Sequence, residues 1–314
     1  MSTLRSPLFH ITQVVDRLDE ALDCHRRLFR RQPLHGGYWE VPQRQAFFTF
    51  VGGVWIEAMA PDLRGGKLRA FVDRFGSRLH SLAWYVRGID DIAEELRRRG
   101  VRFYDSDGDL IEGSVPRHGP MPLPHGYRRT YPPNWSSAVL YTNFRDAAGM
   151  LEFCEPSSDH PLPPRCLDDD MSPESDPLGI VATSHQTIVV PRCDKAAAFF
   201  VEALGGQLFH EGVSSALGVR SAFVLVGEGR GTVVELAEPT ADGPARDDLE
   251  TCGRPILHRT TFLVRDLAAI RDHLVVEGFK VEVDEDGLVV TDPASTVGAR
   301  FAFTDRDLED DPRR

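Results

Sequence analysis

Hydrophobic and polar positions change their period several times along the chain, which predicts strands and helices in alternation. Residues 8–15 alternate with the period of a strand, and the leucines within residues 17–31 fall near one face of a helix. Short apolar runs that predict three more strands follow at residues 38–41, 45–51 and 54–59. The N-terminal part is therefore expected to form one unit of strand, helix and three strands.

This unit recurs along the chain. The segment "LHSLAWYVRGIDDIAEELRRRGVRFYD" from Leu79 and the segment "LHRTTFLVRDLAAIRDHLVVEGFKVEVD" from Leu257 both predict a strand, a helix, a glycine stop and another strand. A further copy begins near His185. Four such βαβββ modules predict the α+β class, with the modules paired into two curved mixed-sheet domains.

The repeats divide the chain near its middle. Residues 156–180 contain six prolines and five aspartates and lack an apolar period, which predicts a linker. We therefore expect one domain in residues 1–155 and a second in residues 181–314. Two domains also agree with the length of 314 residues, since one domain takes about 150 residues.

Composition narrows the class of partner. The formal net charge of -12 disfavours a nucleic-acid binder. No apolar run reaches the roughly 20 residues of a membrane helix, and the N-terminus lacks the apolar segment of a signal peptide. Five cysteines without a CxxC pair predict free thiols in a reducing compartment. We expect a cytoplasmic protein, monomeric or homodimeric, that acts on a small molecule and binds neither nucleic acid nor membrane.

Histidine and glutamate recur at matching strand positions between apolar neighbours. The first half contains four of them: His10, Glu57, His80 and Glu152. The second half repeats the spacing of 23 residues between its glutamate and its second histidine, and its matched residues are His185, Glu235 and His258. A carboxylate is costly to bury unless something compensates it, and a divalent metal compensates two carboxylates while binding neutral imidazoles. The pattern favours a metal site on one face of a curved sheet.

These modules, with histidine on the first strand and glutamate on the last, resemble the vicinal oxygen chelate superfamily, which includes glyoxalase I, methylmalonyl-CoA epimerase, extradiol dioxygenases and bleomycin-resistance proteins. The resemblance covers nearly the whole chain outside the linker. It implies that His10, Glu57, His80 and Glu152 bind a divalent ion of Zn, Fe, Mn, Ni or Co. It also implies a Lewis-acid enzyme of the isomerase or lyase type, in which Glu152 or Glu57 moves a proton.

The second half departs from the same pattern. Aligning "GARFAFTD" with "GMLEFCEP" places Phe301 opposite Glu152, and phenylalanine cannot bind a metal. The second half is therefore interpreted as a degenerate copy, provided that modules one and two pair with each other. Pairing of module one with four and of two with three stays open, and the complete set would then be His80, Glu152, His185 and Glu235.

Two further features leave the reaction open. The long segment between residues 105 and 138 is typical of a binding loop, and its candidate substrate-binding residues are His125, Arg129, Tyr131 and Trp135.

Beside the isomerase or lyase, two other functions stay open. The second hypothesis is an Fe(II) dioxygenase that uses His10, His80 and Glu152. The third is a metal-free binding protein similar to the antibiotic-resistance members.

Overall fold

All four βαβββ modules are present in the computed structural model, which describes residues 8, 10–39, 44–61, 66–106, 108–117, 136–156, 175–227, 231–285 and 287–314. The first module comprises β1 (His10–Val14), α1 (Leu18–Phe29), β2 (Leu34–Trp39), β3 (Arg44–Val51) and β4 (Val54–Pro61). The second comprises β5 (Arg78–Tyr85), α3 (Ile89–Arg98), β6 (Phe103–Tyr104), β7 (Ser136–Thr142) and β8 (Met150–Pro156). The helix α2 (Lys67–Phe75) connects them.

The second half repeats this order. Its first module comprises β9 (Ile180–Val189), α4 (Cys193–Leu204), β10 (Gln207–Ser214), β11 (Val219–Val226) and β12 (Thr232–Pro239). Its second module comprises β13 (Ile256–Val264), α6 (Leu267–Val276), β14 (Val281–Glu285), β15 (Leu288–Thr291) and β16 (Arg300–Thr304). The connecting helix here is α5 (Pro244–Cys252). The α+β class with modules paired into two mixed sheets is confirmed.

Sequential modules share a sheet. The strand orders are β2-β3-β4-β1-β5-β8-β7-β6 and β10-β11-β12-β9-β13-β16-β15-β14. In each sheet the two first strands of the modules pair antiparallel at the centre, and each first strand pairs parallel with the last strand of its own module. The pairing that the sequence left open is therefore one with two and three with four.

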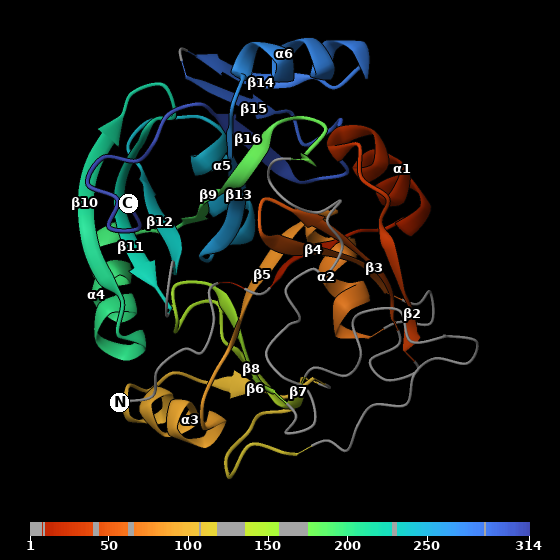
Figure 1. Cartoon of the computed structure of the whole chain (residues 1–314). Coiled ribbons are helices and arrows are strands. Elements are labelled where there is room, and N and C mark those ends of the chain that lie inside the picture. Colours follow the sequence, from red (N-terminus) through yellow and green to blue (C-terminus); the bar gives the residue numbers. More distant parts are fainter. Residues whose placement is uncertain are drawn as a thin grey trace.

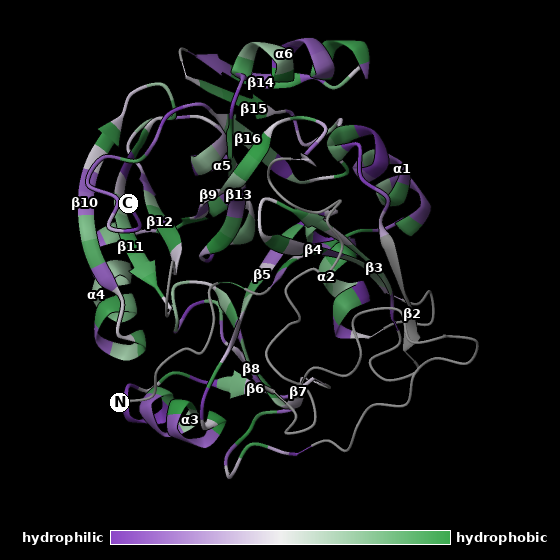
Figure 2. Cartoon of the chain, viewed as in Figure 1, coloured by the Kyte–Doolittle hydropathy of each residue, from purple (hydrophilic) through white to green (hydrophobic). Residues whose placement is uncertain are grey.

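The two sheets share one hydrophobic core. Ile11, Leu82 and Phe153 from the first sheet belong to the same buried cluster as Phe200 and Phe262 from the second half. In Figure 1 the helices α1, α3, α4 and α6 lie at the periphery of the molecule and the central strands lie between them. Figure 2 shows apolar colouring along these central strands and mixed colouring on the helices, as expected for amphipathic helices around a buried core.

Two glycines allow the halves to approach closely. The carbonyl of Gly52 accepts hydrogen bonds from Thr183 N at 2.7 Å and Thr183 Oγ1 at 2.9 Å. Gly298 has a φ of +81°, and a Cβ atom there would collide with the carbonyl of Ser77. Gly52 has a φ of +56°, and a Cβ atom there would lie 2.9 Å from the backbone of Ala182 and Thr183, so only glycine fits either position without strain.

The structure bears on two expectations from composition, the absence of a membrane helix and the free thiols. None of the described helices is long and apolar enough to cross a membrane. Four of the five cysteines, Cys24, Cys154, Cys193 and Cys252, are buried free thiols. Cys166 lies outside the described residues.

Candidate functional site

Strand register places three of the predicted site residues on one face of the first sheet. His10 lies opposite Ala83 of β5, and Ala83 in turn lies opposite Glu152 of β8. Thr12, two residues beyond His10, lies opposite Glu57 of β4. Because residues opposite each other share a face and alternate residues return to it, His10, Glu57 and Glu152 project to the same side. We call these three side chains the acidic cluster.

The acidic cluster is buried and tightly packed. His10, Glu57 and Glu152 are 5%, 4% and 6% exposed. The His10 Nε2 atom lies 3.3 Å from Glu152 Oε2 and 3.6 Å from Glu57 Oε2, so the imidazole stands between two carboxylates.

The charges within the acidic cluster favour a protonated His10 and an ionised Glu152. Burial by itself would lower the pKa of His10, but the charges of Glu152 and Glu57 outweigh burial and raise this pKa above its usual value near 6.5. Burial likewise opposes ionisation of Glu152, yet His10 and Arg44 outweigh it and lower the Glu152 pKa. The acidic cluster is therefore built to hold positive charge between its carboxylates.

Three further polar side chains surround the acidic cluster, and none of them was singled out from the sequence. Arg44 Nη2 lies 3.7 Å from Glu57 Oε1. Tyr141 lies opposite Glu152 on β7, and burial together with the charge of Glu152 raises its phenolic pKa well above 10. Cys154 Sγ donates to Glu152 Oε1 at 3.4 Å. Arg44 lies just before the strand predicted at residues 45–51, so its place at the acidic cluster was not evident from the sequence.

His80 is not the counterpart of His10. Thr12 lies opposite Ser81 while Gln13 lies opposite Leu79, so His80 is the extra residue of a β-bulge. The twofold relation between β1 and β5 therefore exchanges His10 with Ser81. The His80 ring lies 4.7 Å from the Phe71 ring of α2, its Nδ1 lies 3.3 Å from Ser81 Oγ, and burial lowers its pKa to about 3. Among the described residues His80 makes no hydrogen bond or ion pair with the acidic cluster, although the charge of Glu152 is near enough to act on its pKa.

A matching correction applies to the second half. Thr187 lies opposite Arg259, while Leu257 lies opposite Ile188, so His258 is again a bulge residue. Arg259 is therefore the counterpart of His185. Thr261 lies opposite Ala302, which makes Ala302 the counterpart of Glu235. The alignment of Phe301 with Glu152 was one residue off; Phe301 instead packs in the shared core.

An arginine stands where the second half would need a histidine ligand. Arg259 Nη2 donates to Glu235 Oε2 at 3.0 Å. Glu235 also accepts hydrogen bonds from Thr187 Oγ1 at 2.5 Å and Ser221 Oγ at 2.7 Å. His185 Nε2 lies 3.4 Å from Glu235, yet burial lowers the His185 pKa. A guanidinium already neutralises this carboxylate, and Ala302 offers no donor, so this half does not fit a metal ion.

A family model described as the Glyoxalase/Bleomycin resistance protein/Dioxygenase superfamily matches residues 184–295. This stretch of the second half is therefore similar to the superfamily. The predicted superfamily resemblance is thereby confirmed, and the modules of the first half repeat the same topology. No curated protein matches the sequence.

Solved structures show the same fold over the whole chain. A mutant of 4-hydroxymandelate synthase from Streptomyces coelicolor aligns with a TM-score of 0.66 and 13% identity, covering 98% of this chain and 95% of its own. The 2,3-dioxygenase LapB from Pseudomonas sp. KL28 aligns with a TM-score of 0.59 and 12% identity, covering 99% and 96%. At these identities the likeness concerns the fold.

The first half of the chain fits a metal ion by its donor chemistry. One imidazole and two carboxylates are a normal donor set for a first-row divalent ion. Their separations of 3.3 and 3.6 Å are near the roughly 3.0–3.4 Å expected between ligands about 2.1 Å from one ion. In the described part of the chain, however, no group of three or more His, Cys, Asp or Glu side chains is arranged so that it could hold a metal ion. An ion at the acidic cluster would therefore need an arrangement of these side chains other than the one described.

The candidate substrate-binding residues cannot be placed. His125, Arg129, Tyr131 and Trp135 lie outside the described residues. Substrate binding by these four residues stays a prediction.

Proposed function

We propose that this chain is a divalent-metal-dependent enzyme whose active centre is the acidic cluster. Its substrate is a small molecule with neighbouring oxygen atoms, and its reaction is a proton transfer of the isomerase or lyase type. The observation that carries the proposal is the imidazole of His10 between two buried carboxylates on adjacent strands. The superfamily match of the second half supports an enzyme of this general kind.

The surrounding side chains suit this chemistry. An ion bound by His10, Glu57 and Glu152 would polarise a substrate oxygen as a Lewis acid. A glutamate oxygen of the acidic cluster accepts a proton from the carbon beside that oxygen and returns it to the neighbouring position. Arg44 offers guanidinium donors to a developing negative charge. Tyr141, whose pKa is raised further by burial and by Glu152, is protonated at neutral pH and can donate a hydrogen bond to a substrate oxygen.

The strand register favours proton transfer over ring-cleaving oxygenation. The dioxygenase hypothesis needs two histidines and one carboxylate. Ser81 occupies the position related to His10, and the second half has Arg259 and Ala302 at the corresponding positions. Neither half therefore presents two histidines in the related positions of its central strands.

Exchange of carbon-bound hydrogen with solvent deuterium tests the proposal. Dihydroxyacetone, which carries neighbouring oxygens, is incubated in deuterium oxide with the full chain and added Zn²⁺, Mn²⁺, Ni²⁺, Co²⁺ or Fe²⁺, and exchange is followed by NMR. We expect metal-dependent exchange that falls about 10²–10⁴-fold in Glu152→Gln or Glu57→Gln. Glu235→Gln in the second half is the matched control and should retain the rate. Oxygen uptake with catechol in the Fe²⁺-loaded protein would instead support the dioxygenase.

A further inference from the structure

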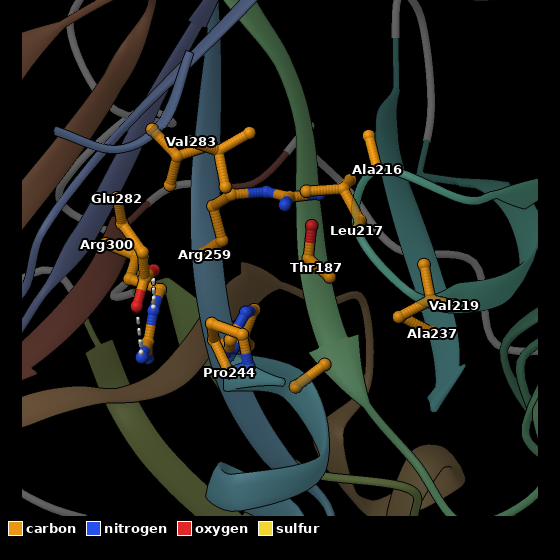
Figure 3. Close-up of a pocket in the computed structure, with 13 residues that line it drawn as sticks. Thr187, Ala216, Leu217, Val219, Ala237, Pro244, Arg259, Glu282, Val283 and Arg300 are labelled. Atoms are coloured by element: carbon orange, nitrogen blue, oxygen red, sulfur yellow. Dashed lines mark hydrogen bonds and ion pairs between the residues drawn. The ribbon is translucent and has the colours of Figure 1, made fainter. Parts of the chain in front are cut away.

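A pocket is lined by strands of the second sheet, by α5 and by the turn between β10 and β11. Its cavity volume is about 40 Å³. Thr187, Ala237 and Arg259 lie on its central strands, Pro244 belongs to α5, and Val283 belongs to β14 (Figure 3). Much of its lining is apolar. The polar residues that line it are Thr187, His258, Arg259, Glu282 and Arg300.

Arg259 brings unfilled hydrogen-bonding capacity to this pocket. A guanidinium has five N–H donors, and within the described part of the chain Arg259 donates one hydrogen bond, to Glu235. Its side chain is 5% exposed, and its Nε is buried without a partner among the described residues. Leaving a buried donor without a partner is unfavourable, so a ligand oxygen at this place would be favoured. In Figure 3 the side chain extends across the pocket from β13 toward the side of Thr187.

The other charged side chains at the pocket form ion pairs and hydrogen bonds with neighbouring side chains. Arg300 Nη1 donates to Asp248 at 2.8 Å and Arg300 Nε donates to Glu282 at 2.7 Å. His258 Nδ1 lies 2.8 Å from the same Asp248 carboxylate. Glu235 shares its charge among Arg259, Thr187 and Ser221. A ligand entering this space therefore meets the free donors of Arg259.

We propose that this pocket binds a small monocarboxylate through Arg259. A planar guanidinium matches the two oxygens of a carboxylate in bidentate geometry. The apolar side chains of Ala216, Leu217 and Val219 suit a short alkyl chain of two to four carbons. In this half a fixed cation thus holds two neighbouring ligand oxygens in place of an ion. The site is separate from the acidic cluster and does not depend on its proposed function.

Calorimetric titration of the full chain with propionate tests this site. Propionamide has nearly the same shape without the charge, and we expect it to bind at least tenfold more weakly. Ala216→Trp, at an exposed position on the pocket rim, should weaken propionate at least tenfold while leaving the ion pair of Arg259 with Glu235 in place. The double variant Arg259→Gln with Glu235→Gln removes both charges of the buried pair together and should cause a similar loss.

The controls separate this site from the first half. Glu152→Gln alters the acidic cluster and should leave propionate affinity unchanged within twofold. Circular dichroism shows whether each variant keeps its fold. Absence of saturable binding up to about 10 mM propionate, tenfold above a Kd of 1 mM, would overturn the proposal. Equal affinity for propionamide, or full affinity in the folded Ala216→Trp and double variants, would also overturn it.

Discussion

Asp248 joins the two halves of the molecule beside the Arg259 pocket. Its carboxylate contacts His258 Nδ1 and Arg300 Nη1, each at 2.8 Å, and Arg78 Nη2 of the first half at 3.5 Å. Burial opposes ionisation, yet the hydrogen bond and charge of His258, together with Arg300 and Arg78, lower the Asp248 pKa from 3.8 to about 2. This shift gives the cost of removing the charge.

Asp248→Asn keeps the shape of the side chain and removes its charge. A shift of nearly two pH units at about 1.36 kcal/mol per unit corresponds to about 2.5 kcal/mol at pH 7. Because the folded pKa lies below the unfolded one, this stabilisation is present above about pH 4 and is lost as the pH falls through 2. Urea denaturation at pH 7 should therefore show a free energy of unfolding lower by about 2–3 kcal/mol.

A surface aspartate provides the control for this change. Asp272→Asn, at an exposed position on α6, should stay within about 0.5 kcal/mol of the wild type. If the free energy of unfolding of Asp248→Asn stays as close to the wild type as that of this control, the charge of Asp248 contributes no net stability.

Two further changes test the close approach of the halves and the buried His25. Gly298→Ala should lower the midpoint of urea unfolding much more than Gly278→Ala does, because both positions have positive φ but only Gly298 faces the Ser77 carbonyl. Equal midpoints for the two variants would show that the contact with Ser77 does not matter for stability. Burial lowers the His25 pKa to about 3, so the unfolded chain takes up a proton below pH 6.5 that the folded chain refuses. Stability should fall by about 2–3 kcal/mol between pH 7 and 4.5 from this group, and His25→Gln should remove that part of the pH dependence. An unchanged pH dependence in this variant would show that His25 is not responsible.

The repeated modules made the fold predictable from the sequence. Matching strand, helix and glycine stops near Leu79 and Leu257 predicted the modules, and both helices begin within them as expected. The connecting helices α2 and α5 were not predicted, although Leu68, Phe71 and Phe75 follow a helical spacing. The similarity of the two halves favoured pairing of module one with two and of three with four, and the strand orders confirm this pairing.

The candidate site was predictable to within one residue at its edges. His10, Glu57 and Glu152 lie together as the alternation predicted. His80 and His258 do match each other, but each is the extra residue of a bulge, and a bulge adds a residue without changing the apolar pattern. Only the strand register identifies Ser81 and Arg259 as the counterparts of the first-strand histidines.

Equilibrium dialysis against Zn²⁺ measures whether the acidic cluster binds a metal ion. We predict one ion per chain in the wild type, bound at least tenfold more weakly by Glu152→Gln. His80→Ala and Glu235→Gln should keep the affinity of the wild type, because neither residue belongs to the acidic cluster. A wild type that binds no Zn²⁺, or an affinity that survives Glu152→Gln and is lost in Glu235→Gln, would contradict a metal centre in the first half.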